Sequence, residues 1–281
     1  MRITVAPSAG FCFGVRRAIK TALDTARQGF RVEMLGDIVH NEDVVRQVEA
    51  AGVRKVDALG DGRGKTLLIR AHGASKHIVA DAQRRGYSIV DATCPMVKEI
   101  HTIVDDFYTR GLRVIIIGDG DHEEVQGIRG QIEAPVTIID SAENIPWEEL
   151  KGVDRAGVVV QSTQKAENVQ AIVNALKPHF KELEVCNTIC KATTTRQQEI
   201  KTLPKACNVV LVIGSRSSAN TRRLYEIARE LNPRSHWIQS KDDIDLAWFE
   251  SAATVGITAG ASTPQGTIDA VVGFLEKCGH F

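Results

Sequence analysis

One pattern occurs three times along the chain, and this repeat limits the folds that the sequence can adopt. In each copy a short apolar run ends in a glycine, and a polar cluster with a helical pattern follows. The three glycines are Gly36, Gly118 and Gly214. A second apolar run follows later in each copy and also leads into polar residues. A repeat of this kind predicts one supersecondary unit per copy, and therefore three related units rather than two unrelated domains.

The apolar runs predict parallel sheets. Residues 114–117 and 210–213 are apolar throughout instead of alternating with polar residues, which is typical of strands that are buried on both faces. Helical patterns separate the runs, as in residues 96–110, where Pro95 occupies a favourable first-turn position. We therefore predict an α/β fold of three pseudo-symmetric sandwich units with parallel sheets. The predicted boundaries are 1–95, 96–191 and 192–281.

The charge balance argues against several classes of protein. Lys and Arg number 35, Asp and Glu also number 35, and the formal net charge is zero, whereas nucleic-acid-binding proteins normally carry a basic excess. No apolar run approaches the ~18 residues of a membrane span. The first ten residues also lack the pattern of a signal peptide. We expect a cytoplasmic protein that binds neither nucleic acid nor membrane.

The chain contains six cysteines, which a reducing compartment would not use as a disulfide framework. Cys94 and Cys190 follow corresponding strands of the first two repeats, and glycines flank Cys12 closely. Three thiolates from three units suit an iron–sulfur cluster in which one iron has no protein ligand. The repeat pattern leaves the third ligand open between Cys12 and Cys278. As single residues, these cysteines could also be small buried hydrophobic residues.

Polar residues follow the predicted strands at matching places in the repeats. They are His40, His72, His122, Thr163, Ser218, Asn220 and Ser262. In open α/β sheets ligands bind beyond the carboxyl ends of the strands, and helix N-termini there favour an anion. Imidazole, hydroxyl and amide donors at these ends predict a phosphate or diphosphate site. Any one of them could be an ordinary helix cap, but their recurrence favours the site.

Glu124 is the candidate acid of this set. Burial in a closed polar pocket would raise the pKa of its carboxyl group toward the working pH and allow it to supply protons. It could also be a first-turn glutamate that the helix dipole stabilises. Glu123 competes for the same role.

Eight motifs, taken in order, resemble those of the 4-hydroxy-3-methylbut-2-enyl diphosphate reductase (IspH/LytB) family. They are GFCFGVRRA at 10–18, GDIVHN at 36–41, RAHG at 70–73, DATCP at 91–95, HEEV at 122–125, QSTQ at 161–164, TICKAT at 188–193 and AGAS at 259–262. Several of these motifs are weak singly, but together they are specific and cover essentially the whole chain.

The resemblance implies a trefoil of the three units around a central [4Fe-4S] cluster with one open iron. Cys12, Cys94 and Cys190 match the three cluster ligands, which favours Cys12 over Cys278. Glu124 matches the proton donor. The residues that match the diphosphate site are His40, His72, His122, Thr163, Ser218, Ala219, Asn220 and Ser262, with Thr163 also beside the substrate hydroxyl. Members commonly carry serine where this chain has Ala219, so we expect weaker substrate binding there.

The activity that the resemblance implies is reductive dehydroxylation of (E)-4-hydroxy-3-methylbut-2-enyl diphosphate. The products are isopentenyl and dimethylallyl diphosphate, in the last step of the methylerythritol phosphate pathway of isoprenoid synthesis. The segment at 118–120 lacks the third glycine of a dinucleotide-binding motif, so we expect reduced ferredoxin or flavodoxin as electron donor. A chain with three internal units is expected to be a monomer.

Two other functions are alternatives to the reductase. One is an iron–sulfur hydro-lyase that needs no electrons, and the other is a redox or metal-sensing protein that binds zinc.

Overall fold

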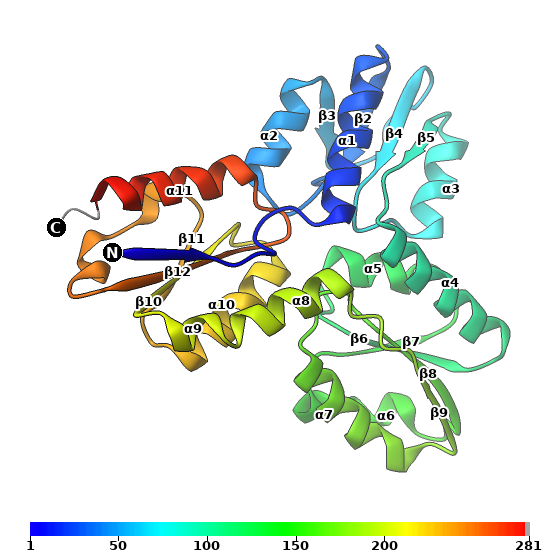
Figure 1. The fold of residues 1–281 in the computed structure, drawn as a ribbon. Coiled ribbons are helices and arrows are strands. Elements are labelled where there is room, and N and C mark those ends of the chain that lie inside the picture. Colours follow the sequence, from blue (N-terminus) through cyan, green and yellow to red (C-terminus); the bar gives the residue numbers. More distant parts are fainter. Residues whose placement is uncertain (279–281) are drawn as a thin grey trace. The chain divides into compact units, whose positions relative to one another are not determined.

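The computed structural model describes residues 1–278, which form three four-stranded sheets and the helices between them (Figure 1). The strands of the first sheet are β2 (Arg31–Leu35), β3 (Val53–Val56), β4 (Lys65–Ile69) and β5 (Ser88–Asp91). Those of the second are β6 (Arg113–Ile117), β7 (Val136–Ile139), β8 (Arg155–Val160) and β9 (Glu182–Val185). Those of the third are β10 (Val209–Ile213), β11 (Ser235–Ile238), β12 (Thr254–Ala259) and β1 (Arg2–Val5).

The helices connect the strands as a parallel fold requires. The α-helices are α1 (Phe13–Arg27), α2 (Glu42–Ala50), α3 (Lys76–Arg84), α4 (Pro95–Thr109), α5 (Glu123–Arg129), α6 (Trp147–Leu150), α7 (Ala166–Leu176), α8 (Lys191–Ile200), α9 (Leu203–Ala206), α10 (Ala219–Leu231) and α11 (Gln265–Cys278). Short 3-10 helices are η1 (Ala142–Asn144), η2 (Lys177–His179), η3 (Lys241–Asp243) and η4 (Leu246–Phe249).

The three sheets share one strand order. The orders are β3-β2-β4-β5, β7-β6-β8-β9 and β11-β10-β12-β1, and all neighbouring strands run parallel. Each sheet therefore has a first central strand (β2, β6 or β10), a second central strand (β4, β8 or β12) and an outer strand (β5, β9 or β1). The prediction of three related α/β units with parallel sheets is confirmed.

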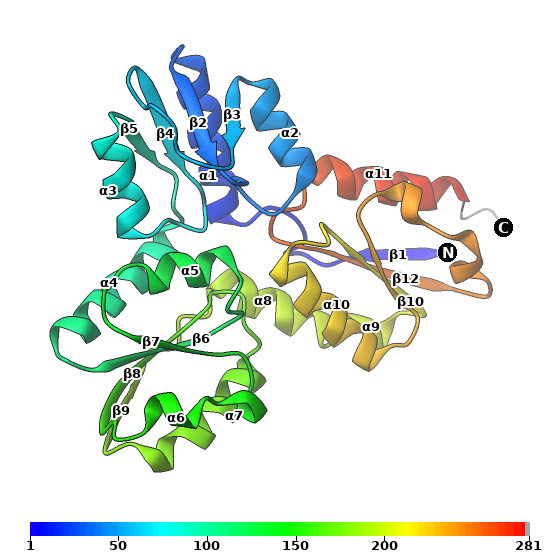
Figure 2. The same ribbon diagram turned by 180° about the vertical axis from the view of Figure 1, so that it is seen from behind.

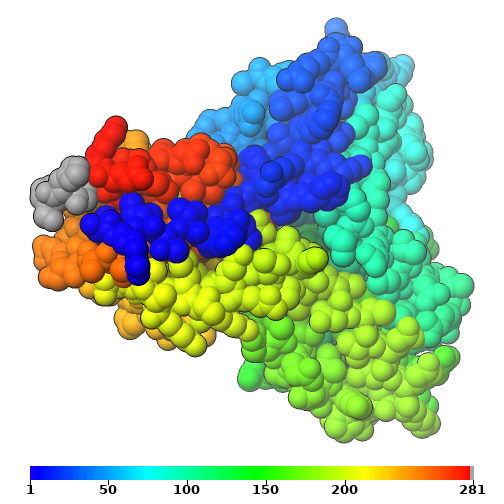
Figure 3. All heavy atoms as spheres, in the orientation of Figure 1, coloured from blue at the N-terminus to red at the C-terminus, as the bar shows by residue number. Residues whose placement is uncertain are grey.

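The outer strand of the third sheet comes from the start of the chain. β1 pairs with β12 from Arg2 opposite Thr254 to Val5 opposite Ile257. It is an edge strand with mostly exposed residues, and Figure 3 shows it in dark blue at the surface near α11 in red. We keep 1–95, 96–191 and 192–281 as a proposed division into repeats, although residues 279–281 lie outside the described chain. The pairing adds residues 2–5 to the third sheet.

Contacts between Cα atoms group the described residues into two compact units. The two-sheet unit contains residues 17–38 and 47–190, with the first and second sheets. The one-sheet unit contains residues 1–16, 39–46 and those from 191 onward, with the third sheet.

The second sheet is buried on both faces, which explains its continuous apolar strands (Figure 2). Ile115 and Ile117 of β6 pack on one face with residues of α6 and α7. Ile116 of β6 packs on the other face with residues of α4 and α5. The third sheet is covered in the same way, by α11 on one face and by α8, α9 and α10 on the other. Among residues 1–278, no helix is long and apolar enough to cross a membrane.

Gly157 marks the closest approach of α4 to the second sheet. A Cβ atom at Gly157 of β8 would overlap the ring of Phe107, which is fully buried. We predict that Gly157→Ala lowers the free energy of unfolding by about 1–3 kcal/mol, because extra volume in a filled core forces side chains and backbone apart. Chemical denaturation measures this value.

Gly273→Ala is the matched control, because a Cβ at this position of α11 meets no atom within 4 Å. This change should instead raise the free energy of unfolding by roughly 0.5–1 kcal/mol, since alanine is the better helix former. Equal effects of the two substitutions would contradict the packing argument.

Candidate active site

A polar residue stands five positions beyond the end of each first central strand. These residues are His40, His122 and Ser218, and each leads within two residues into α2, α5 or α10. The Nδ1 atom of His122 accepts a hydrogen bond from the Glu124 N–H group at 3.1 Å. The Ser218 hydroxyl oxygen accepts one from the Thr221 N–H group at 3.3 Å. The predicted polar residues therefore lie where helices begin, and the helix dipole favours an anion there.

A second set of polar residues stands three positions beyond the end of each second central strand. These residues are His72, Thr163 and Ser262. The Thr163 hydroxyl oxygen accepts a hydrogen bond from Gln161 Nε2 at 3.0 Å. The Ser262 hydroxyl donates to the carbonyl oxygen of His40 at 2.9 Å. Within the one-sheet unit, this bond connects a residue of the second set with a residue of the first.

The three cysteines of the motifs lie between an outer strand and the helix that follows it. Each one directly precedes the first residue of a helix: Cys12 before α1, Cys94 before α4 and Cys190 before α8. Each N–H group donates to the carbonyl two residues beyond a second central strand, at 3.1 Å for Cys12 and 3.0 Å for the other two. The accepting residues are Ala261, Ala71 and Ser162. An anionic group is favoured at such helix starts.

The remaining cysteines have different surroundings. Cys186 and Cys207 pack against hydrophobic clusters, and burial raises the pKa of both thiols. Cys278 is the last residue of α11 and has no outer strand before it. A thiol that stays protonated is a poor metal ligand. The donor set at Cys12, Cys94 and Cys190 therefore fits an iron–sulfur group better than the other three thiols do.

The loop that carries Cys12 is held from α8 by two side chains. Arg196 is buried, and its guanidinium donates to the Gly10 carbonyl at 2.5 Å and to the Ala192 carbonyl at 3.0 Å. The Glu199 carboxylate accepts hydrogen bonds from the Ser8 hydroxyl at 2.5 Å and from the Ser8 N–H group at 3.2 Å. These contacts support the loop immediately before Cys12.

The backbone of that loop also requires a glycine. Gly10 has φ of +95°, a conformation that side chains rarely adopt. A Cβ there would lie 3.2 Å from Ile268 Cδ1 and 3.5 Å from the Thr263 carbonyl oxygen. The loop can therefore pack closely against α11 and its preceding turn only because residue 10 is glycine.

Glu124 is a buried acid. Its side chain accepts hydrogen bonds from the Ser162 N–H group at 2.6 Å and from the Ser162 hydroxyl at 2.8 Å, and the residue is 3% exposed. Burial raises the pKa of the Glu124 carboxyl, whereas the bonds from Ser162 and the charge of a protonated His72 oppose that rise. A carboxyl with a raised pKa keeps its proton closer to neutral pH and can serve as a general acid.

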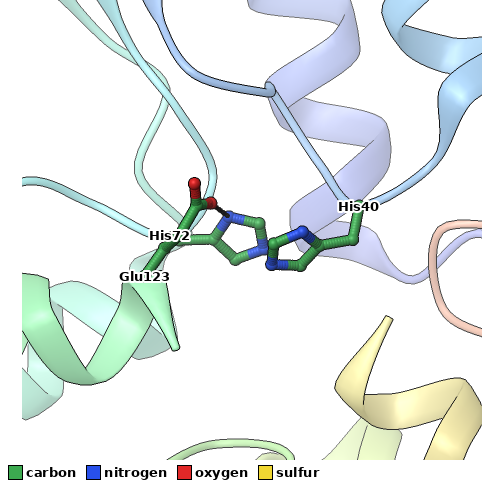
Figure 4. A group of neighbouring side chains, drawn as sticks. All are labelled: His40, His72 and Glu123. Atoms are coloured by element: carbon green, nitrogen blue, oxygen red, sulfur yellow. Dashed lines mark ion pairs between the residues drawn. The ribbon is translucent and has the colours of Figure 1, made fainter. Parts of the chain in front are cut away.

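Glu123 has a different environment from Glu124. This difference decides which of the two glutamates is the candidate acid, a question that the sequence alone does not answer. One oxygen of the Glu123 carboxylate pairs with the Arg70 guanidinium. The other oxygen lies 3.3 Å from His72 Nδ1 (Figure 4). The side chain is 31% exposed. Glu124 is therefore the candidate proton donor of the pair.

Asn220 of α10 presents a buried donor in the one-sheet unit. The residue is 5% exposed, and within the described chain its Nδ2 atom has no hydrogen-bond partner. A buried amide without a partner costs free energy, so this atom is suited to a polar ligand. Ala219 beside it is 7% exposed and contributes no side-chain donor.

The predicted residues divide between the two units. The two-sheet unit holds His72, Cys94, His122, Glu124, Thr163 and Cys190. The one-sheet unit holds Cys12, His40, Ser218, Ala219, Asn220 and Ser262. In the two-sheet unit the His72 and His122 rings meet edge to face, with centroids 5.7 Å apart.

Sequence reasoning missed the supporting residues Ser162, Arg70 and Arg196. Ser162 and Arg70 lie inside quoted motifs next to the predicted residues, so proximity in sequence could have suggested them. Arg196 lies on α8, and an arginine in a polar helical segment gives no sign in the sequence that it is buried.

Comparison with known proteins gives a consistent result. The family model described as LytB protein matches residues 3–276. A relative from Pelobacter propionicus, named 4-hydroxy-3-methylbut-2-enyl diphosphate reductase, is 43% identical over 99% of this chain and 98% of its own. A relative of the same name from Geobacter metallireducens is 40% identical over 97% of this chain and 96% of its own.

Two solved structures are similar along nearly the whole chain. One, described as (E)-4-hydroxy-3-methyl-but-2-enyl diphosphate reductase, the terminal enzyme of the non-mevalonate pathway, is 36% identical with a TM-score of 0.73 and covers 99% of this chain and 100% of its own. The other, a reductase from Plasmodium falciparum, is 27% identical with a TM-score of 0.89 and covers 98% of this chain and 87% of its own. As the motifs predict, the chain belongs to the LytB protein family.

Proposed function

We propose that this chain catalyses the reductive dehydroxylation of (E)-4-hydroxy-3-methylbut-2-enyl diphosphate in the non-mevalonate pathway of isoprenoid synthesis. The similarity over 99% of the chain to a relative that bears the name of this reductase carries the proposal. The reaction consumes two electrons and two protons and releases one water molecule. The products are isopentenyl and dimethylallyl diphosphate.

The family is one of iron–sulfur proteins, and we assign a [4Fe-4S] cluster to Cys12, Cys94 and Cys190. Each of the three thiols directly precedes a helix, and its N–H group bonds the carbonyl two residues beyond a second central strand, which supports this assignment. When bound, a cluster of this kind supplies electrons and an open iron that polarises the substrate hydroxyl group.

We assign the diphosphate to the polar residues at the ends of the central strands. Imidazole, hydroxyl, amide and backbone N–H donors can together bind a multiply charged anion. The assigned residues are His40, His72, His122, Thr163, Ser218, Ala219, Asn220 and Ser262, with only a backbone contribution from Ala219. The buried, unpartnered Nδ2 atom of Asn220 supports the assignment.

Glu124 supplies the proton to the leaving oxygen in this proposal. Burial raises the pKa of the carboxyl, so it holds its proton to higher pH than an exposed glutamate, and Ser162 holds it in place at the end of β8. Thr163 is the next residue and carries a hydroxyl that can orient or relay the proton beside the substrate hydroxyl. Protonation allows the oxygen to depart as water.

The proposal also includes the partners and setting of the enzyme. We assign reduced ferredoxin or flavodoxin as the electron donor, a monomeric state, and a location in the cytoplasm. Size-exclusion chromatography with light scattering tests the monomer.

Turnover of the anaerobically purified protein tests the function. We expect both diphosphate products when a reduced carrier is present and none without it. Turnover without electrons would favour a hydro-lyase. A colourless protein that contains zinc and no iron would contradict the cluster and favour a zinc-binding protein.

Restoring a hydroxyl at position 219 tests the diphosphate assignment. We predict that Ala219→Ser lowers the KM for the substrate by about threefold to tenfold, because a hydrogen bond to a charged group is worth roughly 1.5–3 kcal/mol before ordering costs. The kcat value should stay unchanged. The control is Thr194→Ser, which alters an exposed threonine of α8. A KM that stays unchanged in Ala219→Ser would remove the side chain of residue 219 from the diphosphate site.

A further inference from the structure

The carboxylate of Glu123 contacts two basic side chains of the two-sheet unit, Arg70 and His72. One oxygen pairs with Nη1 of Arg70. The other lies 3.3 Å from Nδ1 of His72 (Figure 4). The side chains of Arg70 and His72 are only 17% and 15% exposed. These contacts are therefore better shielded from solvent than an ordinary surface ion pair, and they are worth correspondingly more.

The position of Arg70 is itself constrained. Its guanidinium lies against Gly36 at the end of β2, where a Cβ atom would overlap Nη1. Gly36 has φ of +75°, so a side chain is disfavoured there by the backbone as well. The guanidinium thus occupies space that Gly36 leaves open and pairs with one oxygen of the Glu123 carboxylate, while the other oxygen faces His72.

Glu123 is also held through its backbone, because it is the first residue of α5. His122 directly before it is the helix cap, and the ring of His122 meets the ring of His72 edge to face. The imidazole of His72 is therefore contacted by a carboxylate at Nδ1 and by a neighbouring ring. Contacts of this kind fix the orientation of an imidazole and decide which nitrogen faces a ligand.

We propose that Glu123 is a positioning residue for His72. Held by Arg70, its carboxylate engages Nδ1, so that Nε2 is the atom that donates to the diphosphate of the substrate. An imidazole that donates from both nitrogens carries a positive charge, and the carboxylate balances this charge while the anion is bound. The inference rests on the proposed function, because it takes the substrate diphosphate as the ligand of His72.

Two measurements on the cluster-loaded enzyme test the proposal. Calorimetry gives the dissociation constant of inorganic diphosphate, and steady-state kinetics give KM and kcat for the substrate. In Glu123→Gln we expect both the dissociation constant and KM to rise about tenfold, with kcat within about twofold of the unaltered enzyme. Arg70→Gln should act in the same direction but less strongly. The control is Glu133→Gln, an exposed residue beyond α5 that should change neither value.

A double-mutant cycle separates positioning from a general effect on the fold. In a His72→Asn background, Glu123→Gln should cause no further loss of diphosphate affinity, because the residue on which it acts is absent. An equal tenfold loss in both backgrounds, or unchanged affinity in Glu123→Gln alone, overturns the proposal. If the unaltered enzyme binds diphosphate but does not turn over the substrate, the proposed function fails and the role of Glu123 is still decided by the binding data.

Discussion

Glu124→Gln should reduce kcat by about 100-fold or more, because it removes a general acid whose contribution is typically 10²–10⁴-fold. The substitution keeps the size of the side chain and the acceptor for the Ser162 N–H group, which bonds the carboxylate at 2.6 Å. Iron content and KM should therefore stay close to those of the unaltered enzyme. Anaerobic steady-state kinetics with iron analysis measure all three values.

The pH dependence of kcat gives a second test of Glu124. Because burial raises the pKa of this carboxyl, the acid persists to higher pH than in an exposed glutamate, and turnover should fall as the pH rises through the raised value. The Ser162 hydroxyl lowers that pKa, so Ser162→Ala should move the fall to still higher pH. Unchanged kcat in Glu124→Gln would remove Glu124 from the chemistry.

The raised pKa also links Glu124 to stability. A carboxyl with a folded-state pKa above its unfolded value stabilises the fold while it is protonated, and that contribution is lost as the pH rises through the folded value. In Glu124→Gln this loss should disappear, so thermal unfolding of the variant should depend less on pH than that of the unaltered protein. A variant that is more stable and less active fits a buried catalytic group.

Replacement of Cys12, Cys94 or Cys190 by serine should remove most of the iron and, with it, turnover. Each thiol directly precedes a helix and follows an outer strand, and a cluster that retains only two protein thiolates is poorly held. Iron and sulfide analysis with electron paramagnetic resonance measures the loss. The fold should survive, because each change is nearly isosteric and each N–H anchor belongs to the backbone.

Matched controls come from the other cysteines. Cys186→Ser, Cys207→Ser and Cys278→Ser should keep the iron content. The half-buried positions 186 and 207 should lose some stability, because a hydroxyl replaces a thiol that packs against a hydrophobic cluster. The comparison of Cys12 with Cys278 is the most informative. Iron lost in Cys278→Ser but kept in Cys12→Ser would falsify the ligand assignment.

Much of the fold could be predicted from sequence because its signals are local. The apolar run at 114–117 lies within β6, and Gly118 directly follows it. The same is true of Gly36 after β2 and Gly214 after β10. Polar residues at strand ends were likewise visible, since a parallel sheet places them at one edge.

The parts that could not be predicted depend on distant contacts. Nothing within residues 2–5 indicates that they pair with β12 at the far end of the chain, so the equivalence of Cys12 with Cys94 and Cys190 was hidden from repeat analysis alone. Glu123 and Glu124 are neighbours at one helix start. The packing of α5 against the end of β8 and the 70–73 turn buries Glu124 and leaves the Glu123 side chain 31% exposed.

The pairing of β1 with β12 has a consequence for biosynthesis. Translation makes β1 well before β12, its partner in the third sheet. The carbonyl of Ala261, which anchors the Cys12 N–H group, is made later still. The nascent chain thus presents Cys12 on a segment without its sheet partner until residues 254–261 have been made. The anchors of Cys94 and Cys190, the carbonyls of Ala71 and Ser162, are made before those thiols or with them. Under the proposed ligand assignment, Cys12 is therefore the last of the three thiols to reach its folded position.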